Sequence, residues 1–116
     1  SEQWRKAVDE RMRETERDAE SREKMLAAAR RAAEIIKKYF KTERVALYGD
    51  YFSPVPINFW SRVSLVYWGK GEKSLEAWHE VFQEIEKECG KDVDVDFKEY
   101  DFLTKAERKQ LEENSL

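Results

Sequence analysis

The stretch that decides the fold is "RVALYGDYFSPVPINFWSRVSLVYWGKG", residues 44 to 71. It contains two short apolar runs, VALY at 45–48 and VSLVYW at 63–68, and both are rich in β-branched and aromatic residues. Runs of this length and composition are typical of buried β-strands. Gly49 follows the first run, and the residues between the runs include two prolines, so we expect the order strand, loop, strand.

The flanking segments predict a third strand and four helices. Acidic and apolar residues alternate in DVDVDF at 92–97, which indicates a strand with an apolar face and an acidic face. Apolar residues recur at helical spacing in the segments at about 2–20, 25–40, 74–90 and 101–116. The chain has 116 residues, which suits one domain. We therefore predict an α+β fold in which helices pack on a small mixed sheet.

The last two helices carry the clearest signals of their ends and of their buried sides. Ser74 is a preferred N-cap residue, and Gly90 stands where the end of a helix favours a left-handed backbone. The side expected to face the core carries Leu75, Trp78, Phe82, Ile85 and Cys89. The C-terminal helix is expected to dock through Phe102, Leu103 and Leu111.

The N-terminal helix is long and highly charged, with a narrow apolar stripe formed by Trp4, Val8 and Met12. Helical stability in water comes mostly from packing of an apolar face, so this stripe is expected to dock on the domain or on a second copy of the chain. A break near Ser21 would separate this helix from the next, although Lys24 stands where a capping box needs Glu or Gln. The chain is accordingly divided into a helical extension, 1–24, and a domain, 25–116.

Composition and charge exclude several classes of function. Charged and apolar residues each make up 41% of the chain, and no apolar run approaches the ~18 residues of a membrane span. We predict a cytoplasmic protein with no membrane partner, in which the single cysteine, Cys89, is structural. Basic and acidic residues alternate at helical spacing from Glu10 to Arg17, which favours a solvated, salt-bridged face. Nucleic acid is therefore not an expected partner.

Two short motifs carry a resemblance to a known family. Gly49-Asp50 follows the first predicted strand, and Ser61-Arg62-Val63-Ser64 begins the second. In their order of elements and motif spacing, residues 25–112 resemble the minimal nucleotidyltransferase domains of the DNA polymerase β superfamily, which include many small prokaryotic antitoxin-like proteins. In that family the first strand ends in Gly-Ser, the second begins Ser-Asp-x-Asp, and the third supplies one more Asp. Here Gly49 and the serine at 61 keep their places, whereas both aspartates of the second motif are replaced.

The resemblance implies which residues would form the site. The nucleotide-binding positions would be Gly49, Asp50, Ser53 and Ser61, and the family's catalytic aspartates correspond to Arg62, Ser64 and Asp96, with Asp94 as the alternative to Asp96. In the family, two magnesium ions activate the attacking hydroxyl and are held by anionic oxygens. Arg62 carries a charge of the wrong sign, and the Ser64 hydroxyl is a weak neutral ligand. We therefore predict a degenerate site without catalysis.

Cation and nucleotide binding remain open as expectations. The weak candidates for a cation site are Asp50, Asp94 and Asp96, although a solvated polar face is the favoured explanation for the acids of the third strand. Arg62 could instead clamp a phosphate directly, which would permit nucleotide binding without turnover. No cofactor is expected, and Mg²⁺ and a nucleoside triphosphate are expected only if activity survives.

Two main functions follow, with an unrelated α+β domain as a third alternative. The first is a binding or antitoxin-like interaction module, whose partner would be a helical protein of the HEPN type, as the resemblance implies, or a second copy in a homo-dimer. Its docking surface would be the apolar stripe of the N-terminal helix or the aromatic loop YFSPVPINFW at 51–60, which could equally cover the end of the sheet. The second is an active or residual nucleotidyltransferase, which would transfer a nucleoside monophosphate to a hydroxyl group of a protein or small molecule.

Overall fold

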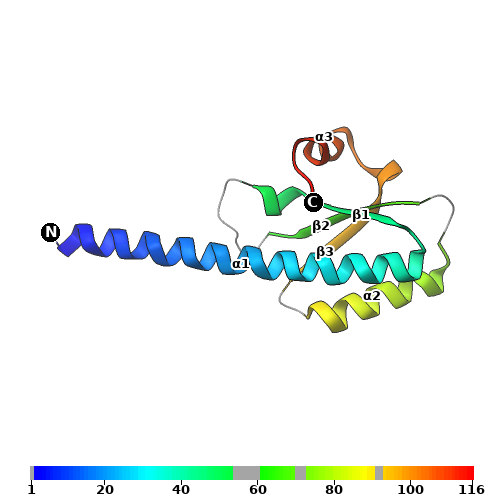
Figure 1. Ribbon diagram of the computed structural model, residues 1–116, viewed down its shortest axis with the longest axis horizontal. Helices are drawn as coiled ribbons and strands as arrows, with labels where there is room; N and C mark the ends of the chain where they lie inside the picture. The colour runs from blue at the N-terminus through cyan, green and yellow to red at the C-terminus, as the bar shows by residue number, and fades with distance from the viewer. Residues whose placement is uncertain (1, 54–60, 70–72, 91–92) are drawn as a thin grey trace.

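The computed structural model describes residues 2–53, 61–69, 73–90 and 93–116 (Figure 1). In chain order its elements are α1 (Glu2–Phe40), β1 (Arg44–Tyr48), the 3-10 turn η1 (Gly49–Phe52), β2 (Val63–Trp68), α2 (Leu75–Cys89), β3 (Val95–Glu99), the 3-10 turn η2 (Tyr100–Phe102) and α3 (Lys105–Glu113). The predicted α+β class, with helices packed on a small mixed sheet, is confirmed. Among the described helices, none has the length and apolar character needed to cross a membrane.

The two N-terminal helices predicted from the sequence are a single helix. α1 runs for 39 residues, so the predicted break near Ser21 is wrong, and the helix passes without interruption through residues 24 and 25. The reason is that no glycine or proline interrupts residues 2–40, and a lone serine does not stop a helix of good formers. A helix of this length measures roughly 58 Å. The C-terminal part of α1 packs on the sheet, while its N-terminal part projects beyond the domain (Figure 1).

β2 is the central strand of the sheet, whose order within the described residues is β1-β2-β3. It pairs antiparallel with β1 and parallel with β3, and α2 makes the crossover that a parallel pair requires. β1 and β2 lie where the sequence predicts them to within one residue, but β3 begins at Val95 instead of residue 92. The register explains this difference, because pairing begins with Val63 opposite Val95, the first residues of both strands. Asp94 therefore precedes β3, and Asp92 lies outside the described residues.

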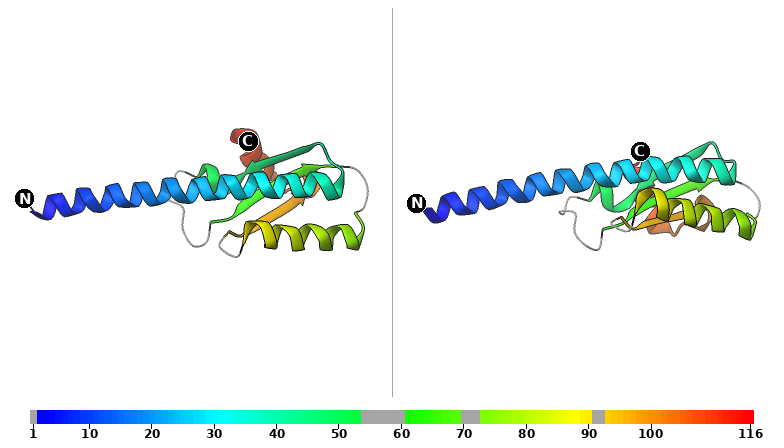
Figure 2. Two further views of the ribbon diagram at one scale, coloured as in Figure 1. Left: turned by 60° about the horizontal axis from the view of Figure 1, so that its bottom comes forward. Right: turned by 90° about the horizontal axis from the view of Figure 1, so that it is seen from below.

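Different helices cover the two faces of the sheet (Figure 2). α1 and α2 cover one face and enclose the main core, which contains Met25, Ala29, Ala32, Ile35, Ile36, Phe40, Leu47, Val63, Leu65, Tyr67, Val81, Ile85 and Phe97. On the opposite face, α3 helps to form a smaller core of Tyr48, Val66, Leu103 and Leu111. Successive residues of β2 alternate between these two cores, so its continuous apolar run is explained by burial on both faces.

Several predicted core contacts are wrong. Leu75, Phe82 and Phe102 are 87%, 57% and 75% exposed. α2 buries Val81, which was not predicted, together with Ile85, which was, because its packing against α1 rotates its buried side. The apolar stripe predicted for α2 therefore has the correct helical period, but it is displaced around the helix from the side that is buried.

Other local predictions are confirmed. The Ser74 Oγ accepts a hydrogen bond from the Ala77 N–H at 3.1 Å, and Gly90 ends α2 with a φ of 73°. Leu103 and Leu111 are buried and attach the C-terminal segment to the sheet.

Candidate functional site

Gly49 directly follows β1, at the end of the sheet where the positions predicted from the resemblance lie. Its φ is +81°, a left-handed conformation that glycine adopts without steric cost. A Cβ atom at this position would lie 3.4 Å from the Oγ of Ser64. The register places Ser64 opposite Tyr48 on one side and Asp96 on the other, so these three residues form a row across the sheet. Gly49, Ser64 and Asp96 therefore share one end of the sheet.

Asp50 and Arg62 connect the turn after β1 to the residue that precedes β2. The Asp50 carboxylate accepts a hydrogen bond from the Arg62 backbone N–H at 2.8 Å. The Arg62 guanidinium forms an ion pair with Asp94, whose Oδ2 lies 3.2 Å from Nε, and both side chains are more than half exposed. The Asp94 carbonyl oxygen accepts a hydrogen bond from the Val63 N–H at 2.8 Å. These contacts join three connecting segments at the same end of the sheet.

We call this set the strand-start cluster, and it consists of Gly49, Asp50, Arg62, Ser64, Asp94 and Asp96. The other two positions predicted to bind nucleotide, Ser53 and Ser61, lie beside it along the chain. Ser53 follows η1, and its carbonyl oxygen accepts a hydrogen bond from the Arg22 guanidinium of α1 at 2.8 Å. The part of the predicted aromatic docking loop at 54–60 lies outside the described residues.

The chemistry of the strand-start cluster suits a polar link between segments better than a two-metal site. Asp50 already accepts a backbone hydrogen bond, and Asp94 already faces the positive charge of Arg62. Magnesium prefers several anionic oxygens in octahedral geometry. Within residues 2–53, 61–69, 73–90 and 93–116, no group of three or more His, Cys, Asp or Glu side chains is placed to hold a metal ion.

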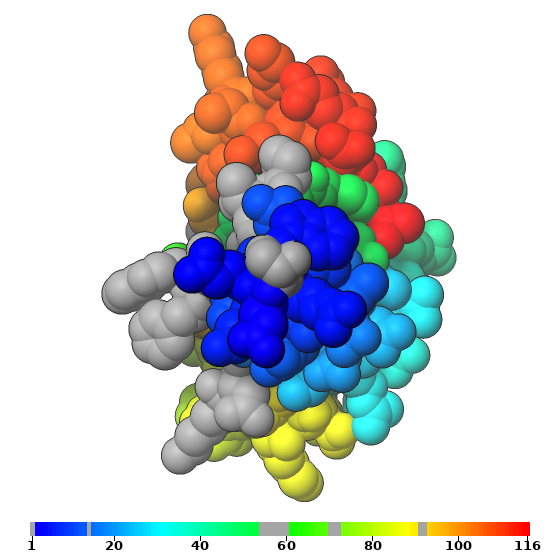
Figure 3. Space-filling model, turned by 90° about the vertical axis from the view of Figure 1, so that its left-hand side faces the viewer, coloured from blue at the N-terminus to red at the C-terminus, as the bar shows by residue number. Residues whose placement is uncertain are grey.

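The projecting part of α1 carries a second candidate surface. Trp4 and Met12 are 68% and 62% exposed, and Val8 between them is half-buried. A shallow hollow of about 530 Å³ lies on this side of the helix and is lined by Val8, Arg11, Met12, Thr15 and Glu16. Viewed from the N-terminal end, the first turns of α1 stand in front of the domain (Figure 3). Arg22 joins α1 to the domain, because it donates hydrogen bonds to two backbone carbonyl oxygens at the end of η1.

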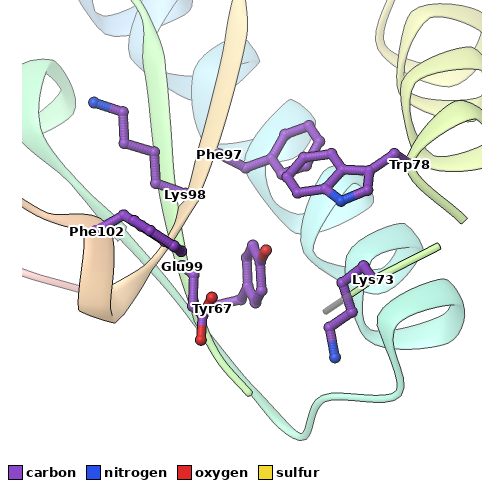
Figure 4. A pocket seen from close by; sticks show the side chains of 7 residues that line it. All are labelled: Tyr67, Lys73, Trp78, Phe97, Lys98, Glu99 and Phe102. Atoms are coloured by element: carbon purple, nitrogen blue, oxygen red, sulfur yellow. The ribbon is translucent and has the colours of Figure 1, made fainter. Parts of the chain in front are cut away.

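A third candidate surface is a pocket of about 700 Å³ that the sequence analysis missed. It lies at the C-terminal ends of β2 and β3, beside the start of α2 (Figure 4). Its lining consists of Tyr67, Lys73, Trp78, Phe97, Lys98, Glu99 and Phe102. Alternation along β2 and β3 indicates that Tyr67 and Phe97 are buried, but it does not reveal that their side chains meet around a hollow.

The three surfaces occupy different places in the fold. The strand-start cluster lies at the N-terminal ends of β2 and β3, the aromatic pocket at their C-terminal ends, and the apolar stripe on the projecting helix. Comparison with known proteins assigns none of them, because no family model, curated protein or solved structure matches this chain.

Proposed function

We propose that this chain is a non-catalytic, antitoxin-like interaction protein built on a nucleotidyltransferase-like domain. The likeness is supported by the strand-start cluster, whose six residues share one end of the sheet. The loss of catalysis is supported by Arg62, which stands at the position of the family's first metal-binding aspartate and pairs with Asp94. A guanidinium at this position repels the divalent cation that the reaction requires.

The observation that carries the proposal is the projection of α1 (Figure 1) with Met12, at the middle of its apolar stripe, exposed. Met12 is 62% exposed, and the projecting segment of α1 contains few other apolar residues. An isolated helix gains little stability from propensity alone, and a contiguous exposed apolar surface marks an interaction site. The stripe and the hollow beside it therefore form the proposed interaction surface.

The partner that the geometry favours is a second copy of the chain, bound antiparallel. The stripe continues along the same side of the helix toward the domain and has its largest side chain, Trp4, at one end and its smallest, Ala19, at the other, with Val8, Met12 and Thr15 between them. In an antiparallel pair centred near Met12, Trp4 faces Ala19 of the partner subunit and Val8 faces Thr15 of the partner subunit. The largest side chain then meets the smallest, and Val8 meets a side chain of nearly equal size, so the pairs can pack closely.

The position of the domain also favours the antiparallel arrangement. At Arg22, α1 is bound to the backbone at the end of η1. A parallel partner would bring its own domain to this place, whereas an antiparallel partner ends there and leaves the two domains at opposite ends. Residues 2–21 of the two helices would overlap over about 30 Å. Residues 2–20 contain five basic and seven acidic residues, so the two segments carry nearly balanced charge.

Light scattering over a range of protein concentrations tests the pairing. The full chain should give twice the monomer mass of 13.9 kDa at high concentration. Met12→Glu should weaken the dimer more than tenfold, because burial of a methionine side chain contributes about 1.5–3 kcal/mol and two copies are lost. Lys6→Glu places the same new side chain on the other side of the helix and should leave the dimer intact. A full chain that stays monomeric would refute self-pairing and favour the HEPN-type partner.

Disulfide mapping tests the orientation in a Cys89→Ser background. A variant with both Val8→Cys and Thr15→Cys should form links between positions 8 and 15 if the helices are antiparallel. Links of 8 to 8 and 15 to 15 would show a parallel pair. Peptide mass spectrometry distinguishes these products.

The absence of catalysis has its own test. Incubation with labelled ATP, Mg²⁺ and candidate protein acceptors should transfer no label. Calorimetry with ATP or GTP and Mg²⁺ examines the nucleotide-binding alternative, in which Arg62→Ala would weaken binding. Transferred label that is lost on Asp96→Asn would overturn the proposed loss of chemistry.

A further inference from the structure

We propose that the pocket at the C-terminal ends of β2 and β3 binds a small aromatic carboxylate. This site is separate from both the strand-start cluster and the projecting stripe, so the inference is independent of the proposed function. Its volume of about 700 Å³ lies within the range of roughly 300–1,000 Å³ that is usual for small-molecule pockets. Open sheets with parallel strands commonly bind ligands beyond the carboxyl ends of those strands, which is where this pocket lies.

The floor of the pocket contains the hydroxyl group of Tyr67, which faces the open space of the pocket (Figure 4). Tyr67 is only 2% exposed, and within the described residues its Oη takes part in no hydrogen bond. A hydroxyl that faces an open pocket can donate a hydrogen bond to a ligand acceptor there. Burial, with a smaller contribution from the Glu99 carboxylate, raises the pKa of Tyr67, so the hydroxyl stays protonated at neutral pH. Figure 4 shows the Tyr67 hydroxyl and the Trp78 indole N–H directed into the same space.

Lys73 supplies a positive charge at the rim of this space. Its Nζ donates one hydrogen bond to the Phe40 carbonyl oxygen at 3.1 Å, and an ammonium group has three donors. Lys98, the other lysine of the lining, is bonded to Glu107 at 3.1 Å. Tyr67, Trp78 and Lys73 thus contribute three donor groups to the lining of the pocket. A carboxylate is the complement of such a set, because it accepts several hydrogen bonds and carries the opposite charge.

The remaining walls favour an aromatic ring on that carboxylate. Phe97 is 6% exposed and stacks on Trp78 with a centroid distance of 5.2 Å. Phe102 is 75% exposed on the opposite side of the pocket, so a planar ligand would cover apolar surface that now faces water. Glu99 pairs with Tyr67 in the register of β2 and β3, so its negative charge would repel the carboxylate from the strand ends and favour its approach to Lys73.

A titration followed by ¹⁵N–¹H NMR tests the site directly. Indole-3-acetate is the probe, and the Trp78 indole N–H signal, assigned with a Trp78→Phe variant, is the readout. The signal should shift and saturate at millimolar or lower concentration. Tryptamine, which has the same ring but a positive charge, should bind at least several-fold more weakly. Equal binding of tryptamine, or an unchanged Trp78 signal, would overturn the proposal.

Two conservative variants assign the donors. Tyr67→Phe should weaken the binding of indole-3-acetate about 3- to 10-fold, and Lys73→Gln, which keeps a donor for the Phe40 carbonyl, should weaken it more than about 10-fold. Lys109→Gln removes an exposed charge on α3 and should leave binding unchanged. Melting curves establish that each variant is folded. Unchanged affinity in both pocket variants would refute the assignment.

Discussion

Glu107 links α3 to the sheet through hydrogen bonds, and its replacement by alanine should weaken that attachment. One carboxylate oxygen, Oε1, accepts a hydrogen bond from the Thr104 N–H at 3.0 Å and completes a capping box. The other, Oε2, accepts hydrogen bonds from Lys98 at 3.1 Å and from the Tyr48 hydroxyl at 3.2 Å. Glu107→Ala removes all of these contacts in one step.

The magnitude follows from the burial of each partner. Loss of the capping interaction costs about 0.5–2 kcal/mol. Tyr48 is 3% exposed, and a buried hydroxyl left without its acceptor costs about 1–3 kcal/mol. The Lys98 ion pair is partly exposed, at 41% and 21%, and contributes about 0–1 kcal/mol. Because the contacts share one network, we expect Glu107→Ala to lower the free energy of unfolding by about 2–4 kcal/mol.

Urea denaturation measures this loss, with two variants for comparison. Glu107→Gln retains an acceptor for the capping box and should cost about 0.5–2 kcal/mol. Glu112→Ala, at an exposed position on the same helix, should stay within about 0.5 kcal/mol of the parent chain. Equal losses for Glu107→Ala and Glu112→Ala would refute the idea that Glu107 holds α3 in place.

The same carboxylate predicts a dependence on pH. The hydrogen bond from the Thr104 backbone N–H, aided by Lys98, lowers the pKa of Glu107 below its ordinary value of 4.5. A group with a depressed pKa in the folded state stabilises the fold above its unfolded pKa, and this stability is lost as pH falls through the folded pKa. The difference in stability between the parent chain and Glu107→Gln should therefore be largest at neutral pH and should shrink toward about pH 3. A difference that grew on acidification would contradict this assignment.

Two further predictions concern single positions. Gly49→Ala should destabilise the fold by about 1–2 kcal/mol, because the backbone at Gly49 is left-handed with a φ of +81°. Gly69→Ala, at a position where the backbone is not left-handed, should cost less in the same urea experiment. Equal losses of stability in the two variants would contradict this conformational argument. The hydrogen bond from Tyr39 to Glu84 at 2.7 Å, together with desolvation, raises the pKa of Tyr39 to about 12. Glu84→Gln should return this ionisation toward 10 in an ultraviolet titration read against Tyr39→Phe, and an ionisation that stays near 12 would exclude Glu84 as the cause.

The sequence predicts the strands and the local caps well because these depend on neighbouring residues. The apolar run at 63–68 is β2 itself, and its composition suits burial on both faces. Ser74 and Gly90 mark the ends of α2 because capping geometry involves only a few residues of backbone. Such signals do not require knowledge of the rest of the fold.

Features that depend on packing between distant segments were less predictable. Ser21 resembled a break because serine often caps helices, yet uninterrupted helix formers on both sides carry α1 through it. The exposure of Leu75 and Phe82 depends on how α1 rotates α2, and the sequence of α2 does not contain this information. The same limit applies to Phe102, which follows β3 and faces the pocket.

The candidate sites show the same difference between features that local sequence predicts and features that depend on packing between distant segments. The order of motifs along the chain was sufficient to propose that Gly49, Ser64 and Asp96 share one end of the sheet, and the register places them there. The pairing of Arg62 with Asp94 required the relative placement of two connecting segments, which no local pattern encodes. The aromatic pocket was missed because it arises where two strands and a helix end together.

The continuity of α1 has a mechanical consequence. Because one hydrogen-bond ladder extends from the first turn to Phe40 in the main core, the exposed end and the sheet belong to a single stiff rod. A molecule that binds the exposed end of α1 therefore also fixes the orientation of the domain and the distance between the domain and the binding site. The length of the helix thus sets the distance between the domain and any partner bound at the exposed end.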